Sequence, residues 1–239
     1  MSAVHLLLWV ALPYAAIVLF VGGHVWRYRT DQYGWTTRST QLLESRRLKW
    51  GSILFHYGAL AAIGGHVLGI LVPVSATEAV GVSDHSYHVL SATAGTGAGV
   101  ACAVGLLILA WRRTTSARVR VTTTRMDVVV YVLLIVVIAL GLGETVGRNA
   151  LGGGYNYRAT VGEWFRSIIL FHPQPDRMTN APVLYQLHAV AAWLVLAVWP
   201  FSRLVHAWSI PFQYVGRPYI LYRRRWAPAR RNRRQPQRP

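Results

Sequence analysis

The sequence has little charge, very little acid and a single cysteine. Only 14% of its 239 residues are charged, with 25 Lys or Arg against 8 Asp or Glu, whereas about 25% is typical of a soluble domain. The one cysteine, Cys102, excludes an internal disulfide, an iron–sulfur cluster held by cysteines and the C-x-x-C-H attachment of a c-type haem. It lies in an apolar stretch, where we expect it to act as a small packing residue.

Apolar residues make up 53% of the chain and gather in long runs. A helix needs about 20 mostly apolar residues to cross roughly 30 Å of hydrocarbon. Five runs qualify: residues 5–25, 53–72, 89–111, 126–142 and 183–201. The first lacks the basic start and the clear cleavage site of a secretory signal. We therefore predict an all-α fold, an integral membrane bundle of five transmembrane helices.

The basic side chains predict how this bundle is oriented. They gather between the first and second runs, between the third and fourth, and after the fifth, whereas residues 73–88 contain no Lys or Arg. Cytoplasmic loops carry an excess of Lys and Arg, so we expect the N-terminus outside and the C-terminus in the cytoplasm. The net charge of +17, distributed in this way, indicates a multi-pass protein of the cytoplasmic (inner) cell membrane that contacts anionic lipid and no nucleic acid.

Two segments outside the runs have a distinct composition. VGEWFRSIILFH, residues 161–172, has the pattern of a short amphipathic helix lying in the outer interface. The C-terminal RRRWAPARRNRRQPQRP is Pro-rich and highly charged, which is typical of disorder. We therefore divide the chain into a five-helix membrane domain, residues 1–215, and a basic cytoplasmic tail, residues 216–239.

Histidines enter or border two of the apolar runs. FHYGALAAIGGH places His56 and His66 within the second run, and His188 and His206 lie near the two ends of the fifth. An ionisable group in a membrane helix is a functional hypothesis by default. One such histidine taken alone is equally well explained as a neutral ring bonded to a neighbouring helix, so their relative depths decide between the two.

The predicted topology brings these four histidines into two pairs. The second and fifth helices run in opposite directions, so His56 and His206 lie near the inner ends. By the same reasoning, His66 and His188 lie near the outer ends. Two facing imidazoles can fill both axial positions of a b-type haem. We therefore predict two haem b groups, each with its iron held by one pair.

A mismatch in helix rise and four glycines bear on this pairing. Ten residues of helix rise about 15 Å and eighteen about 27 Å, so we expect helix tilt or a bend near Pro200 to absorb the difference. Small residues near the two histidines of the second run either make room for a macrocycle or allow close helix packing: Gly58, Gly64, Gly65 and Gly69.

Four long strings resemble one known family. They are WRYRTDQYGWTTRSTQLLESR, LFHYGALAAIGGHVLGILVP, RVRVTTTRMD and PFSRLVHAWSIPFQYVGRPYILYRRR. In content and order they are similar to the gamma subunit, or cytochrome b subunit, of the membrane-bound respiratory nitrate reductase, and the resemblance covers nearly the whole chain. The haem-ligand positions of that family fall on the same four histidines: His56, His66, His188 and His206.

The resemblance implies a function in electron transfer. A subunit of this family oxidises quinol near the outer haem, here that of His66 and His188, and passes electrons to the inner haem, here that of His56 and His206. An iron–sulfur beta subunit and a molybdenum catalytic alpha subunit then receive the electrons in the cytoplasm and reduce nitrate. The chain would be the quinol-oxidising subunit of this oxidoreductase, with quinol protons released outside.

Contacts to quinol are expected at particular residues. Gly65 and His66 lie near the quinol, but the loop of residues 73–90 lacks the lysine that family members carry there. His85 or His88 could supply the polar contact and take a quinol proton. Either could equally be a solvated loop histidine.

Two arginines near the inner ends of helices could contact the inner haem. Arg112 and Arg203 would give charge-assisted hydrogen bonds to its propionates. The alternative is that both anchor their helices on the cytoplasmic side, which requires no cofactor.

Two other functions stay open from the residues alone. A dihaem cytochrome b could serve another quinol-linked reductase, because four histidines do not specify the final acceptor. A transporter, or a membrane anchor without haem, could use the same histidines to conduct protons or to pack. Reduced-minus-oxidised spectra separate the cytochromes from this last class, since only a cytochrome gives a b-type α-band.

Overall fold

The computed structural model describes residues 2–208. Within that part every regular element is helical, and five helices are long and apolar enough to cross a membrane: Ala3–Thr30, Arg46–Leu71, Asp84–Thr115, Arg125–Ala150 and Val183–Phe201. The prediction of five such helices is confirmed. Their orientation in a membrane stays a prediction. The predicted domain boundary at residue 215 and the basic tail lie outside the described residues.

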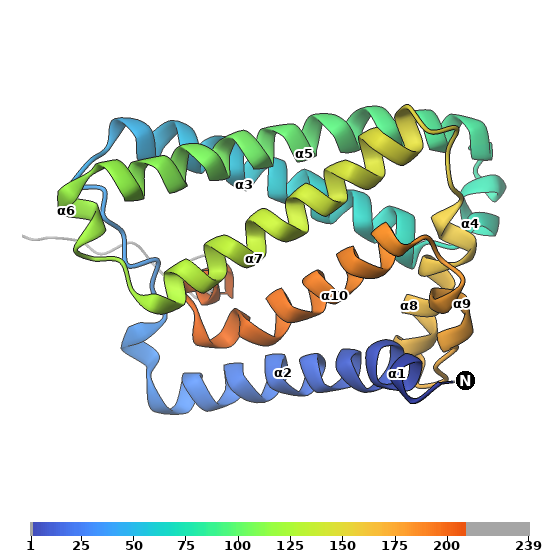
Figure 1. Cartoon of the computed structure of the whole chain (residues 1–239), viewed down its shortest axis with the longest axis horizontal. Helices are drawn as coiled ribbons and strands as arrows, with labels where there is room; N and C mark the ends of the chain where they lie inside the picture. Colours follow the sequence, from blue (N-terminus) through green and yellow to red (C-terminus); the bar gives the residue numbers. More distant parts are fainter. Residues whose placement is uncertain (1, 209–239) are drawn as a thin grey trace, which may run out of the picture. The chain divides into compact units, whose positions relative to one another are not determined.

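Most of the long helices combine several elements, labelled as in Figure 1. They comprise α1 (Ala3–Leu6), η1 (Leu7–Ala11) and α2 (Leu12–Thr30); α3 (Arg46–His66) and η3 (Val67–Leu71); α5 (Asp84–Thr115); α7 (Arg125–Leu142) and η4 (Gly143–Ala150); and α10 (Val183–Val198) and η6 (Trp199–Phe201). The other segments contain η2 (Gln32–Gly34), α4 (Val74–Ala79), α6 (Ala117–Arg120), η5 (Tyr157–Ala159), α8 (Val161–Ile169), α9 (Pro175–Thr179) and η7 (Arg203–Trp208).

The fourth long helix extends past its predicted end at Leu142. Its last eight residues form η4, in which the hydrogen bonding widens to the π-helical pattern. The prediction stopped early because residues 143–150 are polar, but the structure keeps them helical, and Glu144 among them is buried. A π-helical segment is rare and often lies at a functional site.

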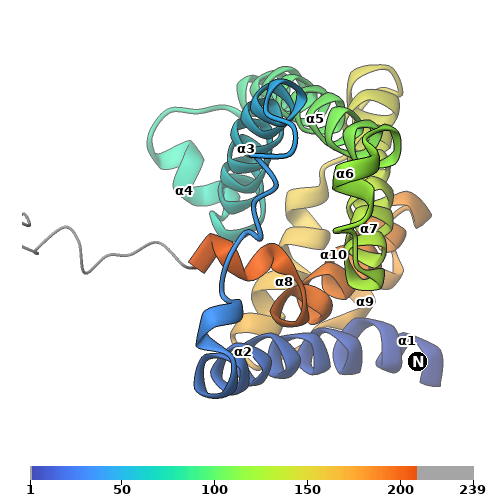
Figure 2. The same ribbon diagram turned by 90° about the vertical axis from the view of Figure 1, so that its left-hand side faces the viewer.

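Glycine sets how closely the helices approach. α3 packs along α5, and α10 packs between α7 and α2 (Figure 1, Figure 2). A Cβ on Gly58 would lie 2.5 Å from the backbone nitrogen of Cys102, so Gly58 serves close helix packing. Cys102 is buried at this contact, as predicted. A Cβ on Gly64 or Gly65 would meet no atom within 4 Å.

The predicted amphipathic segment forms α8, and its apolar face packs onto protein. Trp164 is buried, and its indole N–H donates to the carbonyl of Trp9 at 2.9 Å. The indole rings of Trp9 and Trp164 meet edge to face with their centroids 5.9 Å apart, and Trp193 of α10 packs on the ring of Trp164. α8 therefore belongs to the hydrophobic core that joins the first and fifth long helices.

The fifth long helix breaks at the bend expected near Pro200. α10 ends at Val198, η6 follows, and Ser202 is extended before η7 begins. Nη1 of Arg27 donates to the carbonyls of both Pro200 and Ser202, at 2.7 Å each. The interval from His188 to His206 is therefore not one continuous helix, and the rise of about 27 Å expected for eighteen helical residues does not apply to it.

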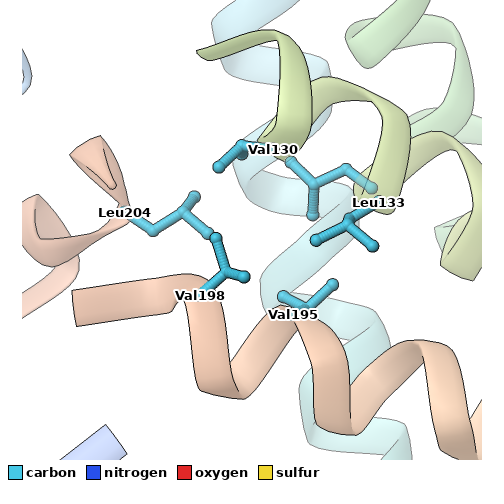
Figure 3. A pocket seen from close by; sticks show the side chains of 6 residues that line it. Val130, Leu133, Val195, Val198 and Leu204 are labelled. Carbon is cyan, nitrogen blue, oxygen red and sulfur yellow. The ribbon is translucent and has the colours of Figure 1, made fainter. Parts of the chain in front are cut away.

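Aliphatic side chains hold η7 against the helices beside it. Val195 and Val198 of α10, Leu204 of η7 and three residues of α7 line a small apolar pocket (Figure 3). The α7 residues are Val130, Leu133 and Leu134. Because this pocket spans the break, it fixes the direction in which the chain continues to His206.

Candidate functional site

His56 and His206 face each other from α3 and η7. Their ring centroids are 5.9 Å apart and the ring planes are inclined by 69°. Nδ1 of His56 donates to the carbonyl of Ser52 at 2.8 Å, and Nδ1 of His206 donates to the carbonyl of Arg203 at 2.6 Å. A carbonyl can only accept, so these bonds put the ring proton on Nδ1 and leave Nε2 with its lone pair.

His66 and His188 form the second pair, from α3 and α10. Their centroids are also 5.9 Å apart, but their planes are nearly parallel, at 15°. Nδ1 of His66 donates to the carbonyl of Ala62 at 2.6 Å. The ring of His188 lies against α7, where a Cβ on Gly141 would come within 2.9 Å of its Cε1. Gly141 therefore leaves the space that the ring occupies.

The two pairs have the chemistry of metal-binding imidazoles. A ligating histidine usually donates its other ring N–H to a carbonyl or carboxylate, as three of these four do. Metal–imidazole bonds are about 2 Å long, so two rings on opposite sides of one ion have centroids roughly 6 Å apart. In residues 2–208 no group of three or more His, Cys, Asp or Glu could hold a metal ion. A haem iron requires only two protein ligands, so these residues fit the group.

The structure thus brings together the partners that the topology predicts. His56 and His66 lie ten residues apart on α3, about 15 Å along the helix, so the pairs occupy two levels of the bundle. Apart from these histidines, α3 packs mainly on α5, and α10 packs mainly on α7 and α2. Ligation of haem by the four rings stays a prediction.

Arg112 binds the loop that contains Thr40 and Glu44. It is buried, and its Nε donates to Glu44 Oε2 at 2.6 Å, while Nη2 donates to the carbonyls of Thr40 and Glu44. Burial opposes the charge on Glu44, but hydrogen bonds from the Arg47 N–H and from Arg112 hold the pKa of Glu44 below its usual value. A propionate contact for Arg112 stays a prediction, and its observed function is to tie this loop to α5.

Arg203 is bound to a buried acid. Its Nε and Nη2 donate to the two carboxylate oxygens of Asp127, both at 2.5 Å. Asp127 also closes the capping box that begins α7 with Thr124, and Arg113 lies 3.4 Å from it. Because the Arg203 carbonyl anchors His206, this ion pair positions the histidine. A propionate contact for Arg203 stays a prediction.

The residues expected near quinol lie on two helices, Gly65 and His66 on α3 and His85 and His88 on α5. Gly65 and His85 are exposed, and a Cβ on Gly65 would meet no atom within 4 Å. His88 is half-buried, with its Nε2 3.2 Å from the carbonyl of Asn149 in η4. His88 is therefore attached to the end of the fourth long helix, one helical turn beyond His85 on α5. Contacts of these residues with quinol stay predictions.

Sequence reasoning missed a group of phenols one turn beyond His66 and His188. Tyr87 and Tyr157 bond through their hydroxyls at 3.1 Å, directly over Gly69, where a Cβ would meet both hydroxyls. Tyr185 stacks 6.3 Å from Tyr157. Burial, and then the bond from Tyr87, raises the pKa of Tyr157. We call Tyr87, Tyr157 and Tyr185 the phenol layer.

One ionisable residue in this region had a signal that could have revealed it. Glu144 is buried, with Oε1 free of any hydrogen-bond partner, and it is the acid of η4. A carboxyl in a membrane helix is a functional hypothesis in its own right. It was missed because the predicted helix ended two residues before it.

Comparison with known proteins assigns the chain to a group. Residues 5–225 match the family model described as nitrate reductase gamma subunit. The nitrate reductase gamma chain of Bacillus subtilis (strain 168) is 42% identical over 219 residues, which cover 92% of this chain and 98% of that protein. The respiratory nitrate reductase 1 gamma chain of Escherichia coli (strain K12) is 33% identical, over 89% of this chain and 94% of that one.

A third relative is longer. The nitrate reductase-like protein NarX of Mycobacterium tuberculosis (strain ATCC 25618 / H37Rv) is 45% identical over 220 residues. These cover 92% of this chain but 34% of that protein. The five apolar helices and these similarities together identify a multi-pass membrane protein.

Proposed function

The chain belongs to the nitrate reductase gamma subunit family, and from that membership we propose that it oxidises quinol and passes the electrons through two haem b groups. As a gamma subunit it is the membrane component of an oxidoreductase complex. The proposed acceptors are an iron–sulfur beta subunit and a molybdenum alpha subunit in the cytoplasm. Quinol is oxidised to quinone near the outer face, where its two protons leave as its two electrons move inward.

One observation supports this proposal above all others: two histidine pairs, each with centroids 5.9 Å apart, on two levels of the bundle. Haem b bound at each level would take up and release single electrons. The chain itself contributes the four imidazoles, the carbonyl groups that fix three of them, and Gly141, which admits the ring of His188.

The orientation is part of the proposal. Basic residues gather at the end of the bundle that holds His56 and His206, and cytoplasmic ends carry such an excess. His66 and His188 then lie toward the outer side, so quinol is oxidised there and the N-terminus is outside. Electrons move from the level of His66 and His188 to the level of His56 and His206.

Reduced-minus-oxidised spectra of the purified complex test the proposal. The unmodified complex should show a b-type α-band. His66→Ala should remove the part of it that belongs to the outer haem, along with quinol oxidation, and largely spare the inner haem. His172→Ala, at an exposed loop histidine, is the matched control and should change neither. Absence of an α-band would overturn the haem assignment, and equal loss of both centres in His66→Ala would overturn the pairing.

A further inference from the structure

We propose that Glu144 is the carboxylate that accepts the protons of the quinol oxidised beside His66 and His188. The inference rests on the proposed function, and Glu144 is not among the site residues that the sequence predicts. The side chain of Glu144 is 9% exposed and its Oε1 has no hydrogen-bond partner. A buried carboxyl without a partner is costly, so an acid at this position of a predicted membrane helix indicates a function.

Helix geometry puts Glu144 next to the outer histidine pair. Gly141 faces the ring of His188, and residues three apart on a helix share a face. One turn outward from this contact lie Glu144 on the fourth long helix and Tyr185 on α10, because the two helices run in opposite directions. Glu144 is indeed within electrostatic range of Tyr185. The carboxyl and the phenol layer therefore cover the same side of the His66–His188 level.

Polar groups continue from Glu144 toward the end of the bundle. The hydroxyl of Tyr185 donates to Asn149 Oδ1 at 3.3 Å, and the carbonyl of Asn149 lies 3.2 Å from Nε2 of His88. The other titratable neighbours of Tyr185 are Tyr155 and Arg148. No cation forms an ion pair with Glu144 among residues 2–208. His88 marks the exit of this path and Glu144 its entry.

The proposed step is balanced as follows. A quinol O–H bond breaks, and its proton forms the O–H bond of a carboxylic acid at Glu144. The acid releases this proton outward past Tyr185 and His88, and the regenerated carboxylate takes the second one. Quinol becomes quinone, two protons leave the membrane, and two electrons pass singly to the outer haem of the proposed function.

Glu144→Gln in the complete complex tests the step, because glutamine keeps the shape and removes the proton-accepting group. We expect quinol-driven nitrate reduction to fall at least about tenfold, in line with loss of a general base. Nitrate reduction driven by a reduced viologen, which delivers electrons to the partner subunits directly, should stay unchanged, as should the b-type spectrum. Glu78→Gln, the same change at an exposed carboxyl of α4, is the matched control and should leave all three unchanged.

Infrared difference spectroscopy supplies a readout besides activity. Reduced-minus-oxidised spectra should contain the C=O band of a carboxylic acid, lost in Glu144→Gln and kept in Glu78→Gln. An unchanged band, or unchanged quinol-driven turnover with both haems present, would overturn the inference.

If Glu144→Gln assembles without haem, the inference is tested on the unmodified complex instead. An apolar carbodiimide should then label Glu144 and slow quinol oxidation, whereas labelling elsewhere only would overturn the inference. If the unmodified complex lacks haem b, or does not oxidise quinol, the proposed function itself fails.

Discussion

The two ends of the bundle hold their histidines by different means. At the end that contains His56 and His206, arginine–carboxylate contacts of 2.5–2.6 Å hold the neighbouring segments, and that of Arg203 with Asp127 is bidentate. At the other end, around His66 and His188, the hydrogen bonds of the phenol layer and its neighbours are neutral and 3.1–3.3 Å long, and the buried Arg158 lies over the ring of Tyr87 at 4.0 Å. These bonds join the phenol layer, a histidine and an amide, beside an acid whose Oε1 has no hydrogen-bond partner.

The two kinds of hydrogen bond suit different functions. Charge-assisted hydrogen bonds are about twice as strong as neutral ones and fix geometry, so the first end is built as a rigid support for the short η7 segment. Neutral hydrogen bonds are the weaker kind, so the phenol layer can rearrange more readily, which suits the proposed quinol, which must enter, lose protons and leave. Substitutions at either end test this difference.

The largest effect is expected from Asp127→Ala. This change leaves Arg203 and Arg113 near a buried site without their acid, which typically costs about 3–5 kcal/mol, and it removes the side chain that holds η7. The free energy of unfolding should fall by this amount. The reduced-minus-oxidised spectrum should lose the signal of the proposed haem at His206 and keep that of the proposed haem at His188. Asp176→Ala, at an exposed acid, is the control. Equal loss of both centres would contradict the idea that the two ends are built independently.

A smaller effect is expected from Gly141→Ala at the opposite end. The added methyl would lie 2.9 Å from the ring of His188, so the ring must move, and such overpacking costs about 1–3 kcal/mol. The spectral change should be confined to the outer centre. Gly97→Ala adds the same methyl to α5 where no atom lies within 4 Å. It should be neutral or stabilise the helix by up to about 1 kcal/mol, and an equal effect of the two variants would count against a positioning function for Gly141.

The smallest effect is a pH dependence at the arginine-rich end. The folded pKa of Glu44 is lowered, so its carboxylate stabilises the fold above its ordinary pKa of about 4.3. This stabilisation is lost as the pH falls through the lowered value. Glu44→Gln should therefore flatten the pH dependence of the unfolding temperature between about pH 5 and pH 3, whereas Glu78→Gln should not. A curve with the wild-type slope would show that Glu44 has no such linkage.

Composition was enough to predict the helices, because a membrane span must satisfy its backbone internally and be apolar over about 20 residues. The partners His56 with His206, and His66 with His188, followed from depth and direction alone. Depth could not reveal that α10 stops at Val198, since a break depends on which groups donate hydrogen bonds to the freed carbonyls. Here that group is Arg27, on another helix.

The partners of the arginines could not be predicted for a similar reason. Asp127 lies 76 residues from Arg203 in the sequence and Glu44 lies 68 from Arg112. Nothing in local pattern connects them. Glu144 was missed because polar letters were taken as the end of a helix, although burial by neighbouring helices lets η4 continue through them.

The bond from Arg27 to the break at Pro200 also has a consequence for biosynthesis. The guanidinium leaves the ribosome long before the carbonyls that it binds, which lie 173 and 175 residues later in the chain. The first long helix therefore lacks these hydrogen bonds in the membrane until the fifth long helix is inserted. His206 can reach its position only then, so the site at that end is completed only after the fifth long helix has been inserted.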